Sequence, residues 1–332
     1  MNASSPEAAP RVLTFGEALV GYATAQDDLR SGAQFTRFAG GADLNVAVGL
    51  RLLGVDTTWA SVLGRDAHGD YLQDVVDTLG ITPVTVRADG PTALMFKAGG
   101  TSGDPEMLQV RGDTAFARHA GLVLSCGDLL DGIDHLHLTG IVFAVSPVAR
   151  AAAFRLLDAA RDVGITVSFD PNLRLNLWSD LDEMRRTVSS VAARAQVVLP
   201  GLGEARLLTG TDDPAAVADL YLSAGAREVA VKLGDEGAIA FEAGRSVRSR
   251  RFQVDAVDTV GAGDGFAAGY IAAMLAGEDL GAKVDQAAAV GALVTTSRGD
   301  LAAMPTRAHV DALLTRTAAR SHEGGPANAD RH

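Results

Sequence analysis

The chain is poor in cysteine, lacks long apolar runs and has no excess of basic residues. Its 332 residues include one cysteine, Cys126, so no internal disulfide and no metal site built on several cysteines can form. No apolar stretch approaches the roughly 18 residues of a membrane-spanning helix. A formal net charge of -12 argues against binding nucleic acid through its phosphates, which requires a basic surface. These absences favour a protein of the reducing cytoplasm.

The two ends of the chain differ in composition from the rest. Residues 1–10 are polar and rich in Ala and Pro, and they lack the basic region and apolar run of a signal peptide, so we expect a disordered tail. Residues 317–332 become polar and contain a Gly-Gly-Pro break, which predicts a flexible C-terminal tail. No repeat or low-complexity linker divides residues 11–316, and we expect them to form one domain.

Short apolar runs alternate with Ala-rich segments of helical spacing through this domain. The alternation predicts an α/β protein with a mostly parallel sheet and helices on both faces. The expected strands are Val12–Phe15, Thr57–Val62, His135–Leu138, Thr166–Phe169, Val197–Leu199 and Val229–Leu233. The expected helices are Asn45–Leu53, Tyr71–Leu79, Val148–Val163, Leu181–Ala193, Ala215–Ala224, Asp264–Leu275, Val284–Ser297 and Thr306–Thr315.

Two segments interrupt this alternation, at about residues 17–38 and 92–112. They carry short stretches of mixed polarity with no helical pattern between them. We interpret them as strands of a small accessory sheet that forms a lid; the alternative is a pair of surface loops.

A run of small residues, Gly261-Ala262-Gly263, leads directly into an Ala-rich segment that starts with Asp264. Such a loop lets backbone N–H groups converge on an anion, and the helix dipole adds partial positive charge there. A carboxylate beside an anion hole is useful if it takes a proton from a hydroxyl that attacks a bound phosphate. The residues alone leave two alternatives, a capped helix after a tight turn and a dinucleotide-binding loop, and the late position of the motif disfavours the second.

Two motifs of the ribokinase-like (PfkB) carbohydrate kinases have close counterparts in the chain. Their C-terminal signature resembles Asp258–Phe266 (DTVGAGDGF), and their N-terminal signature resembles Gly40–Ala47 (GGADLNVA) followed by Gly64–Gly69 (GRDAHG). Two motifs in the right order, over two hundred residues apart, are far more specific than either alone. The resemblance implies a three-layer α/β/α sandwich with a β-sheet lid, and phosphotransfer from ATP to a sugar hydroxyl with Mg²⁺.

The resemblance also implies roles for individual residues. Asp264 matches the catalytic base of the family, and Gly261, Ala262 and Gly263 match its anion hole. Glu204 corresponds to a residue near Mg²⁺ that acts through water; from its position alone it would be a first-turn helix carboxylate. The residues implied at the ATP site are Asn172, Arg174, Gly201, Lys232, Gly234, Gly237, Gly261, Gly263 and Ala288. Gly201 stands where the family has Asn, so a side-chain contact to the nucleotide is lost. Whether the reaction needs K⁺ near Asp258 stays open.

The substrate site is implied by residues on both halves of the chain. Gly40, Gly41 and Asn45 belong to the N-terminal motif. Arg174 follows a predicted strand, at the end where open α/β sheets bind ligands, and its guanidinium matches a carboxylate or a phosphate bidentately. The alternative is that Arg174 forms a surface salt bridge.

The pattern D-x-N-x-R-x-x-L-W at 170–178 resembles the 2-keto-3-deoxygluconate kinases and also many fructokinases. Arg111 matches an arginine on the lid of the former kinases, and Asp300 matches one of their substrate contacts. Two arginines suit a sugar acid better than a neutral hexose. Met95 and the pair Gln109-Val110, however, stand where those kinases have tyrosines, so a related acid or another sugar stays open.

We therefore predict a kinase that converts 2-keto-3-deoxygluconate to its 6-phosphate. The alternatives are a fructokinase or other neutral-sugar kinase, and a non-catalytic sugar-binding or sensor protein on the same fold. The family often dimerises through its lid strands, so we expect a homodimer.

His135 and His137 share one strand face, but no Cys or acidic partner at metal spacing accompanies them. We expect the basic cluster Arg245–Arg251 to keep a surface hairpin in contact with water.

Overall fold

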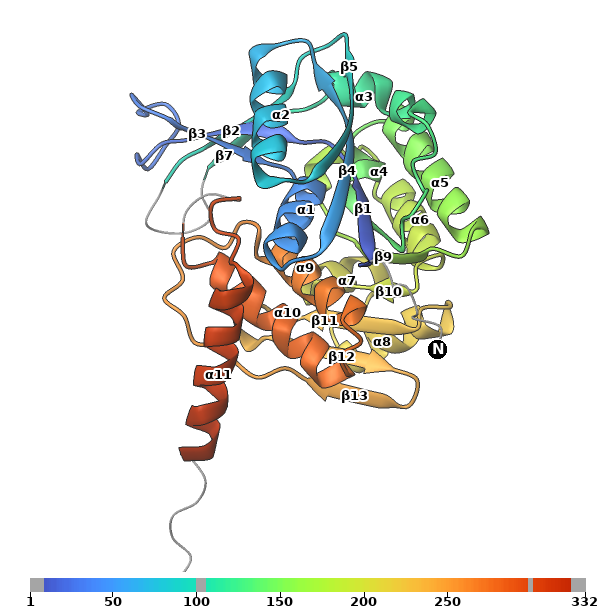
Figure 1. Cartoon of the computed structure of the whole chain (residues 1–332), viewed down its shortest axis with the longest axis vertical. Helices are drawn as coiled ribbons and strands as arrows, with labels where there is room; N and C mark the ends of the chain where they lie inside the picture. Colours follow the sequence, from blue (N-terminus) through green and yellow to red (C-terminus); the bar gives the residue numbers. More distant parts are fainter. Residues whose placement is uncertain (1–8, 100–105, 298–300, 324–332) are drawn as a thin grey trace, which may run out of the picture.

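The computed structural model of the chain describes residues 9–99, 106–297 and 301–323. Within them, a nine-stranded sheet has the order β13-β12-β11-β10-β9-β8-β1-β4-β5 (Figure 1). Its strand pairs are parallel except those that β12 makes with β11 and β13. The strands are β1 (Arg11–Phe15), β4 (Asp56–Gly64), β5 (Thr82–Ala88), β8 (His135–Thr139), β9 (Thr166–Asp170), β10 (Val197–Val198), β11 (Glu228–Lys232), β12 (Ala238–Glu242) and β13 (Arg245–Arg248). The predicted mostly parallel sheet is confirmed.

Helices cover both faces of this sheet, which confirms the three-layer arrangement. One face packs against α1 (Ala42–Leu52), α2 (Ala67–Leu79), α9 (Ala262–Leu275), α10 (Leu280–Val294) and α11 (Arg307–Glu323). The other packs against α3 (Ala115–His119), α4 (Gly140–Ala144), α5 (Pro147–Asp162), α6 (Leu181–Ala192), α7 (Leu202–Thr209) and α8 (Pro214–Ser223). Successive strand residues point to opposite faces. In β1, Val12 therefore enters one core while Leu13 and Phe15 enter the other.

The two segments that interrupt the α/β alternation form a second sheet of four strands, ordered β3-β2-β6-β7. Its strands are β2 (Leu19–Ala23), β3 (Thr36–Gly40), β6 (Ala93–Lys97) and β7 (Met107–Val110). This lid sheet extends from the body beside α1 and α2 (Figure 1). The accessory sheet is confirmed, and the alternative of two surface loops is wrong.

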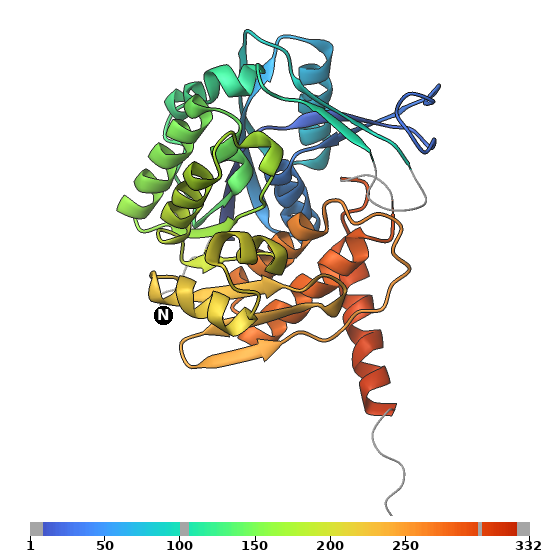
Figure 2. The same ribbon diagram turned by 180° about the vertical axis from the view of Figure 1, so that it is seen from behind.

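Several element ends differ from the sequence predictions. Helix α9 begins at Ala262, ahead of the expected Asp264, because Gly261 adopts φ 83° and serves as its N-cap. Helix α10 begins at Leu280, since the Asp279 side chain accepts a hydrogen bond from the backbone N–H of Ala282. Helix α11 projects from the body and continues to Glu323, past the expected domain end at residue 316 (Figure 2). No Gly or Pro occurs in its sequence before Gly324.

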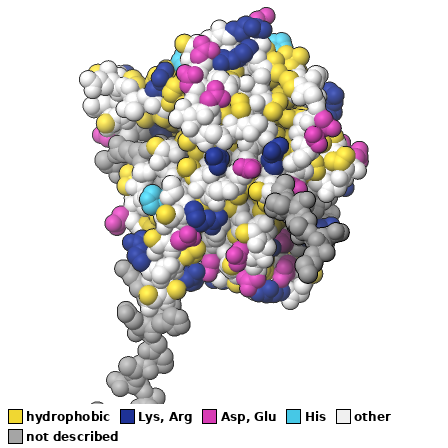
Figure 3. Space-filling view, viewed as in Figure 1, with side chains coloured by type: hydrophobic (Ala, Val, Ile, Leu, Met, Phe, Trp, Pro, Cys, Tyr) yellow, Lys and Arg dark blue, Asp and Glu magenta, His cyan; other side chains and the backbone are white. Residues whose placement is uncertain are grey.

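Charged side chains of both signs are interspersed over the face shown in Figure 3. The basic cluster Arg245–Arg251 forms β13 and the chain after it, which confirms the hairpin, and several of its arginines have acidic partners. Arg248 pairs with Glu236 and Arg250 with Asp285, at 2.6 and 2.7 Å. These pairs tie the cluster to the turn before β12 and to α10.

None of the helices in the described ranges is long and apolar enough to cross a membrane.

The two histidines of β8 lie on one strand face, as predicted, and both are fully buried. His135 Nε2 and His137 Nδ1 each share a hydrogen bond with Ser168 Oγ, at 2.7 and 2.8 Å. Burial lowers the pKa of each imidazole to about 3, so both rings are neutral at physiological pH. They form a polar contact inside the core, and the described residues contain no cluster of three His, Cys, Asp or Glu side chains that could hold a metal.

Candidate active site

Two adjoining pockets meet at the start of α9. The smaller, of about 350 Å³, lies between the lid and the body, and the larger, of about 570 Å³, lies between β11, the chain after β13, and α10. Lys232, Thr259 and Gly263 line both. The carboxyl ends of the strands are where open α/β sheets bind ligands. A molecule in each pocket would therefore bring its reactive end to the same loop.

Asp264 lies in the first turn of α9 and is only 7% exposed. Asn45 Nδ2 donates to its Oδ2 at 2.7 Å, and Asn172 Nδ2 donates to its Oδ1 at 3.1 Å. The two amides come from α1 and from the loop after β9, so three elements meet at one carboxylate. Their donors fix the orientation of Asp264 toward the smaller pocket, whose wall includes all three residues.

The loop before Asp264 is the one predicted to form an anion hole. Gly261 lies in the left-handed region that favours glycine, and this turns the chain so that α9 starts at Ala262. The first N–H groups of a helix have no carbonyl partner within it, and the dipole is positive at this end. Thr259 to Gly263 line the two pockets. The predicted loop is thus at the place where the pockets join.

Lys232 ends β11 and reaches the same junction. Its Nζ pairs with Asp170 Oδ2 at 2.6 Å, and a Cβ placed on Gly263 would lie 3.5 Å from that Nζ. Burial would lower the pKa of Lys232, but the carboxylates of Asp170 and Glu204 outweigh it and raise that pKa, so the ammonium stays charged. Burial also raises the pKa of the Asp170 carboxyl to about 6, against the effect of Lys232. The junction holds a fixed positive charge.

Asn172 reaches Asp264 through an uncommon backbone conformation. Its φ is 38°, and it is the one non-glycine residue with positive φ among those the structure describes. Asn tolerates this region better than most residues. The backbone N–H of Asn172 also donates to Asp170 Oδ1 at 3.1 Å, which fixes the turn after β9. Asn172, predicted at the nucleotide, lines the smaller pocket instead of the larger one.

The two predicted arginines both line the smaller pocket but differ in their surroundings. Arg111 is 5% exposed, and its Nε donates to Glu17 Oε2 at 2.7 Å; Thr114 contacts the other oxygen of Glu17. Arg111 Nη2 has no hydrogen-bond partner in the described part of the chain. Arg174 is exposed, and its Nη1 donates to the carbonyl of Leu173 at 3.0 Å. Arg174 has no acidic partner among the residues that the structure describes, so the surface salt bridge considered for it is not found there.

Glu204 lies in the first turn of α7, as its sequence position suggested. Its Oε1 accepts from the backbone N–H of Leu173 at 2.6 Å, and its Oε2 accepts from that of Gly201 at 3.0 Å. These bonds form a capping arrangement and join α7 to the turn that carries Asn172. Both oxygens therefore have protein partners.

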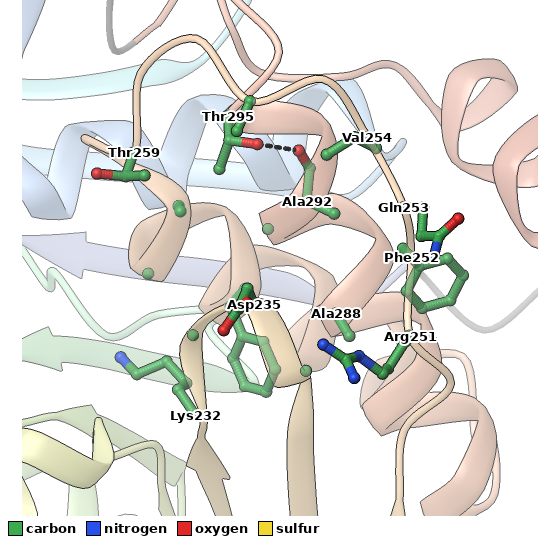
Figure 4. A pocket seen from close by; sticks show the side chains of 17 residues that line it. Lys232, Asp235, Arg251, Phe252, Gln253, Val254, Thr259, Ala288, Ala292 and Thr295 are labelled. Carbon is green, nitrogen blue, oxygen red and sulfur yellow. Dashed lines mark hydrogen bonds between the residues drawn. The ribbon is translucent and has the colours of Figure 1, made fainter. Parts of the chain in front are cut away.

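The larger pocket is built mainly by the second half of the chain (Figure 4). Of the residues predicted at the nucleotide, Lys232, Gly234, Gly237, Gly263 and Ala288 line it. Gly201 and Gly40 line neither pocket, while Gly41 and Gly261 line the smaller one. Asp300, predicted at the substrate, lies outside the described residues.

Sequence reasoning missed part of the larger pocket. Figure 4 shows these side chains on the segment after β13, on α10 and at its C-terminal end: Arg251, Phe252, Gln253, Val254, Ala292 and Thr295. The segment has no periodicity and no motif, so no local signal marks it as a wall. Contacts distant in sequence bring it opposite α10: the pairing of β13 with β12, and the bonds from the N–H and Nε of Arg250 to Asp285 of α10.

A family model described as "pfkB family carbohydrate kinase" matches residues 9–307. The chain belongs to the pfkB family of carbohydrate kinases. Asp258–Phe266 and Gly40–Ala47, whose resemblance to the family suggested this membership, meet in space at the bond between Asn45 and Asp264.

Among relatives of this kinase, 2-dehydro-3-deoxygluconokinase of Bacillus subtilis is 36% identical, with 91% of this chain and 95% of the relative covered. Fructokinase-2 of Solanum lycopersicum is 28% identical, over 91% and 95%. The solved structure of a Xylella fastidiosa fructokinase with bound ATP has a TM-score of 0.82 and 26% identity, and it covers 93% of this chain and 99% of that one. Both substrate classes considered from the sequence thus occur among its relatives.

Proposed function

We propose that the kinase transfers the γ-phosphoryl group of ATP to the 6-hydroxyl of 2-keto-3-deoxygluconate. One observation carries the proposal: Asp264, oriented by Asn45 and Asn172, lines the smaller pocket beside Gly263, which lines both pockets. The larger pocket would take ATP, whose γ-phosphate would reach the start of α9. The smaller pocket would take the sugar acid, with the reacting hydroxyl at Asp264.

The proposed reaction uses the groups at this junction in turn. Asp264 accepts the hydroxyl proton as the sugar oxygen forms its bond to the γ-phosphorus, and the bond between that phosphorus and the ADP oxygen breaks. The N–H groups of Gly261 to Gly263 and the ammonium of Lys232 stabilise negative charge on the transferring group. The lid over the smaller pocket excludes water and so limits hydrolysis of ATP.

Mg²⁺ would neutralise phosphate charge at the same junction. The described residues offer no ready-made cluster of three metal-binding side chains, while Glu204 and Asp170 place two carboxylates near Lys232. Mg²⁺ often keeps several waters and binds through one or two carboxylates and substrate phosphates. The residues fit an ion held in that way, with Glu204 acting through water.

The assignment of a sugar acid rests on the two arginines and on sequence similarity. Arg111 and Arg174 line the smaller pocket, and the Bacillus subtilis relative is named for this activity at 36% identity. A fructokinase is the second candidate, because Fructokinase-2 aligns over a similar length and because Met95 and Gln109 replace the lid tyrosines. Asp300 stays a predicted substrate contact.

Replacing Asp264 by Asn tests the proposed base. We expect kcat to fall by about 10²- to 10⁴-fold, the usual contribution of general-base catalysis, with little change in the KM for either substrate. ADP release would be followed by a coupled assay across a panel of sugars and the corresponding acids. Equal rates for the variant and the wild type would exclude Asp264 as the base, and a wild type without turnover of any sugar would favour the sensor alternative.

Replacing Arg174 by Ala tests the substrate class. The side chain is exposed, so we expect little effect on folding, but its loss removes a charged hydrogen bond of about 1.5–3 kcal/mol from a bound carboxylate. We therefore expect kcat/KM for the acid to fall by about 10- to 100-fold, while that for a neutral hexose stays the same. Arg186→Ala, on the exposed face of α6, serves as a control. An unchanged value for the acid would favour a neutral sugar.

A homodimer through the lid and a cytoplasmic location stay predictions from the sequence. The dimer is supported by apolar side chains on the lid, where Leu108 and Val110 are 54% and 48% exposed.

A further inference from the structure

Lys97 is the last residue of β6 and is held in the lid by its backbone. It lies opposite Ala23 of β2 and Met107 of β7, and its carbonyl accepts a hydrogen bond from the N–H of Thr24 at 3.0 Å. Its side chain leaves the lid sheet. Whatever the ammonium group contacts is therefore tied to the position of the lid.

The ammonium group reaches the segment just before the proposed anion hole. Lys97 Nζ lies 2.5 Å from Asp258 Oδ2, across 161 positions of sequence. The two side chains are only 9% and 14% exposed. A charge pair so far removed from water interacts more strongly than a surface pair, and either partner alone would be costly to bury.

Asp258 in turn fixes the backbone that leads into α9. Its Oδ1 accepts from the N–H of Val260 at 3.1 Å, one residue before the left-handed Gly261. Its own N–H donates to the carbonyl of Thr295 at 3.1 Å, at the end of α10. A shift of the Asp258 carboxylate would therefore move the N–H groups of the loop that both pockets share.

We propose that Lys97 is a positioning residue for phosphoryl transfer, an internal cation that holds the anion-hole loop in place and couples it to the lid. The inference rests on the proposed function of that loop. It also answers the question of K⁺ near Asp258: the chain supplies the required positive charge itself, so activity should not depend on an added monovalent cation.

The chemistry of the pair gives a specific test of this role. A lysine ammonium is a compact single positive charge. If only that charge is needed, a small monovalent cation should replace it once the side chain is shortened. Lys97→Ala leaves room for such an ion beside Asp258, whereas Lys97→Met fills the same room with an apolar chain and excludes the ion.

The experiment compares these two variants and the wild type in Na⁺, K⁺ and methylammonium buffers, by ADP release on the best substrate found in the panel. We expect both variants to lose at least tenfold in kcat. K⁺ or methylammonium should restore most of the activity of Lys97→Ala and none of that of Lys97→Met, and the wild type should respond to neither ion.

Lys283→Ala is the matched control, because Lys283 forms a similarly buried pair with Glu228 at 2.7 Å, with side chains 12% and 16% exposed, and lines neither pocket. We expect it to change kcat less than twofold and to show no response to cations. Wild-type activity that requires K⁺, or a loss in Lys97→Ala that no cation restores, would overturn the proposal.

Hydrogen exchange without substrate separates this proposal from the proposed function. In Lys97→Met, the amides of 257–261 should exchange at least tenfold faster than in the wild type, with no such change in Lys283→Ala. Unchanged exchange would refute the coupling even if the kinase is active. If the wild type were inactive on every sugar but exchange were still faster in the variant, the proposed function would be refuted, while the coupling between Lys97 and the loop would stand.

Discussion

At the residue scale, the carboxylates of this kinase differ according to their partners. Asp264 is oriented by two amides, while Asp43, in the first turn of α1, accepts from the N–H and Oγ1 of Thr139 at 3.1 and 3.0 Å. Burial raises the pKa of Asp43 to about 7, and those hydrogen bonds oppose the shift. In an unfolded chain an aspartate has its ordinary pKa of about 3.9. The folded state therefore keeps a proton that the unfolded state releases between these values.

This difference predicts how stability depends on pH. Because the folded form binds more protons, raising the pH from 4 to 7 destabilises the wild type through Asp43, by at most about 1.4 kcal/mol per pH unit, and the effect levels off above 7. Asp43→Asn removes the titration and keeps the shape. We expect the stability of the variant relative to the wild type to increase between pH 5 and pH 8, as measured by urea unfolding. The same relative stability at both pH values would contradict the shifted pKa.

For other side chains, the motifs identified the residue but did not predict its contacts. Arg111 was predicted as a substrate ligand, yet one side of its guanidinium is taken by Glu17, 94 positions away. Glu204 was predicted near a metal, yet its carboxylate caps α7. A motif gives the type and position of a residue, but the partners of its side chain come from other parts of the chain.

At the scale of elements, the start of α9 is where the sequence was most informative. The backbone at Gly261 is left-handed, and this conformation would strain any other residue, at a cost of about 1–2 kcal/mol. Gly277, just after the other end of the same helix, has φ 75° and no neighbour within 4 Å of an added Cβ. The two glycines therefore share the left-handed backbone, but of the two only Gly261 lines a pocket.

Replacing each by Ala separates strain from catalysis. We expect Gly261→Ala and Gly277→Ala to lower the melting temperature by similar amounts, but only Gly261→Ala to lower kcat, by tenfold or more, because it moves the N–H groups of the anion hole. Calorimetry and the ADP assay would measure both effects. Equal loss of kcat in the two variants would mean that the position of this loop does not matter for the reaction.

The elements themselves were largely predictable from the sequence. Buried parallel strands are apolar runs and their helices have a 3.6-residue period, so both leave a local signal. The ends of α9, α10 and α11 were less predictable, because caps such as Gly261 and Asp279 decide them. The wall formed by Arg251 to Val254 left no local signal, since its place depends on the pairing of β12 with β13 and on the contact of Arg250 with Asp285.

At the scale of the whole molecule, the lid carries exposed apolar side chains on β7. Leu108 and Val110 on β7 are about half exposed, and apolar patches of this kind often mark interfaces. We expect the wild type to be a dimer in light scattering and Leu108→Asp to be a monomer. Leu220→Asp, on α8 with 50% exposure, should leave the dimer intact. A monomeric wild type, or a dimer that survives Leu108→Asp, would exclude assembly through this surface.

The sequence by itself determined the α/β architecture, the lid segments and the family, because periodicity and motifs are local properties of a chain. Only the tertiary structure decided which groups act on one another. The bonds from Asn45 and Asn172 to Asp264 span 219 and 92 positions, and the pair of Lys97 with Asp258 spans 161. Such pairs have no spacing rule, since the order of strands in a sheet and the path of the chain between them bring their members together.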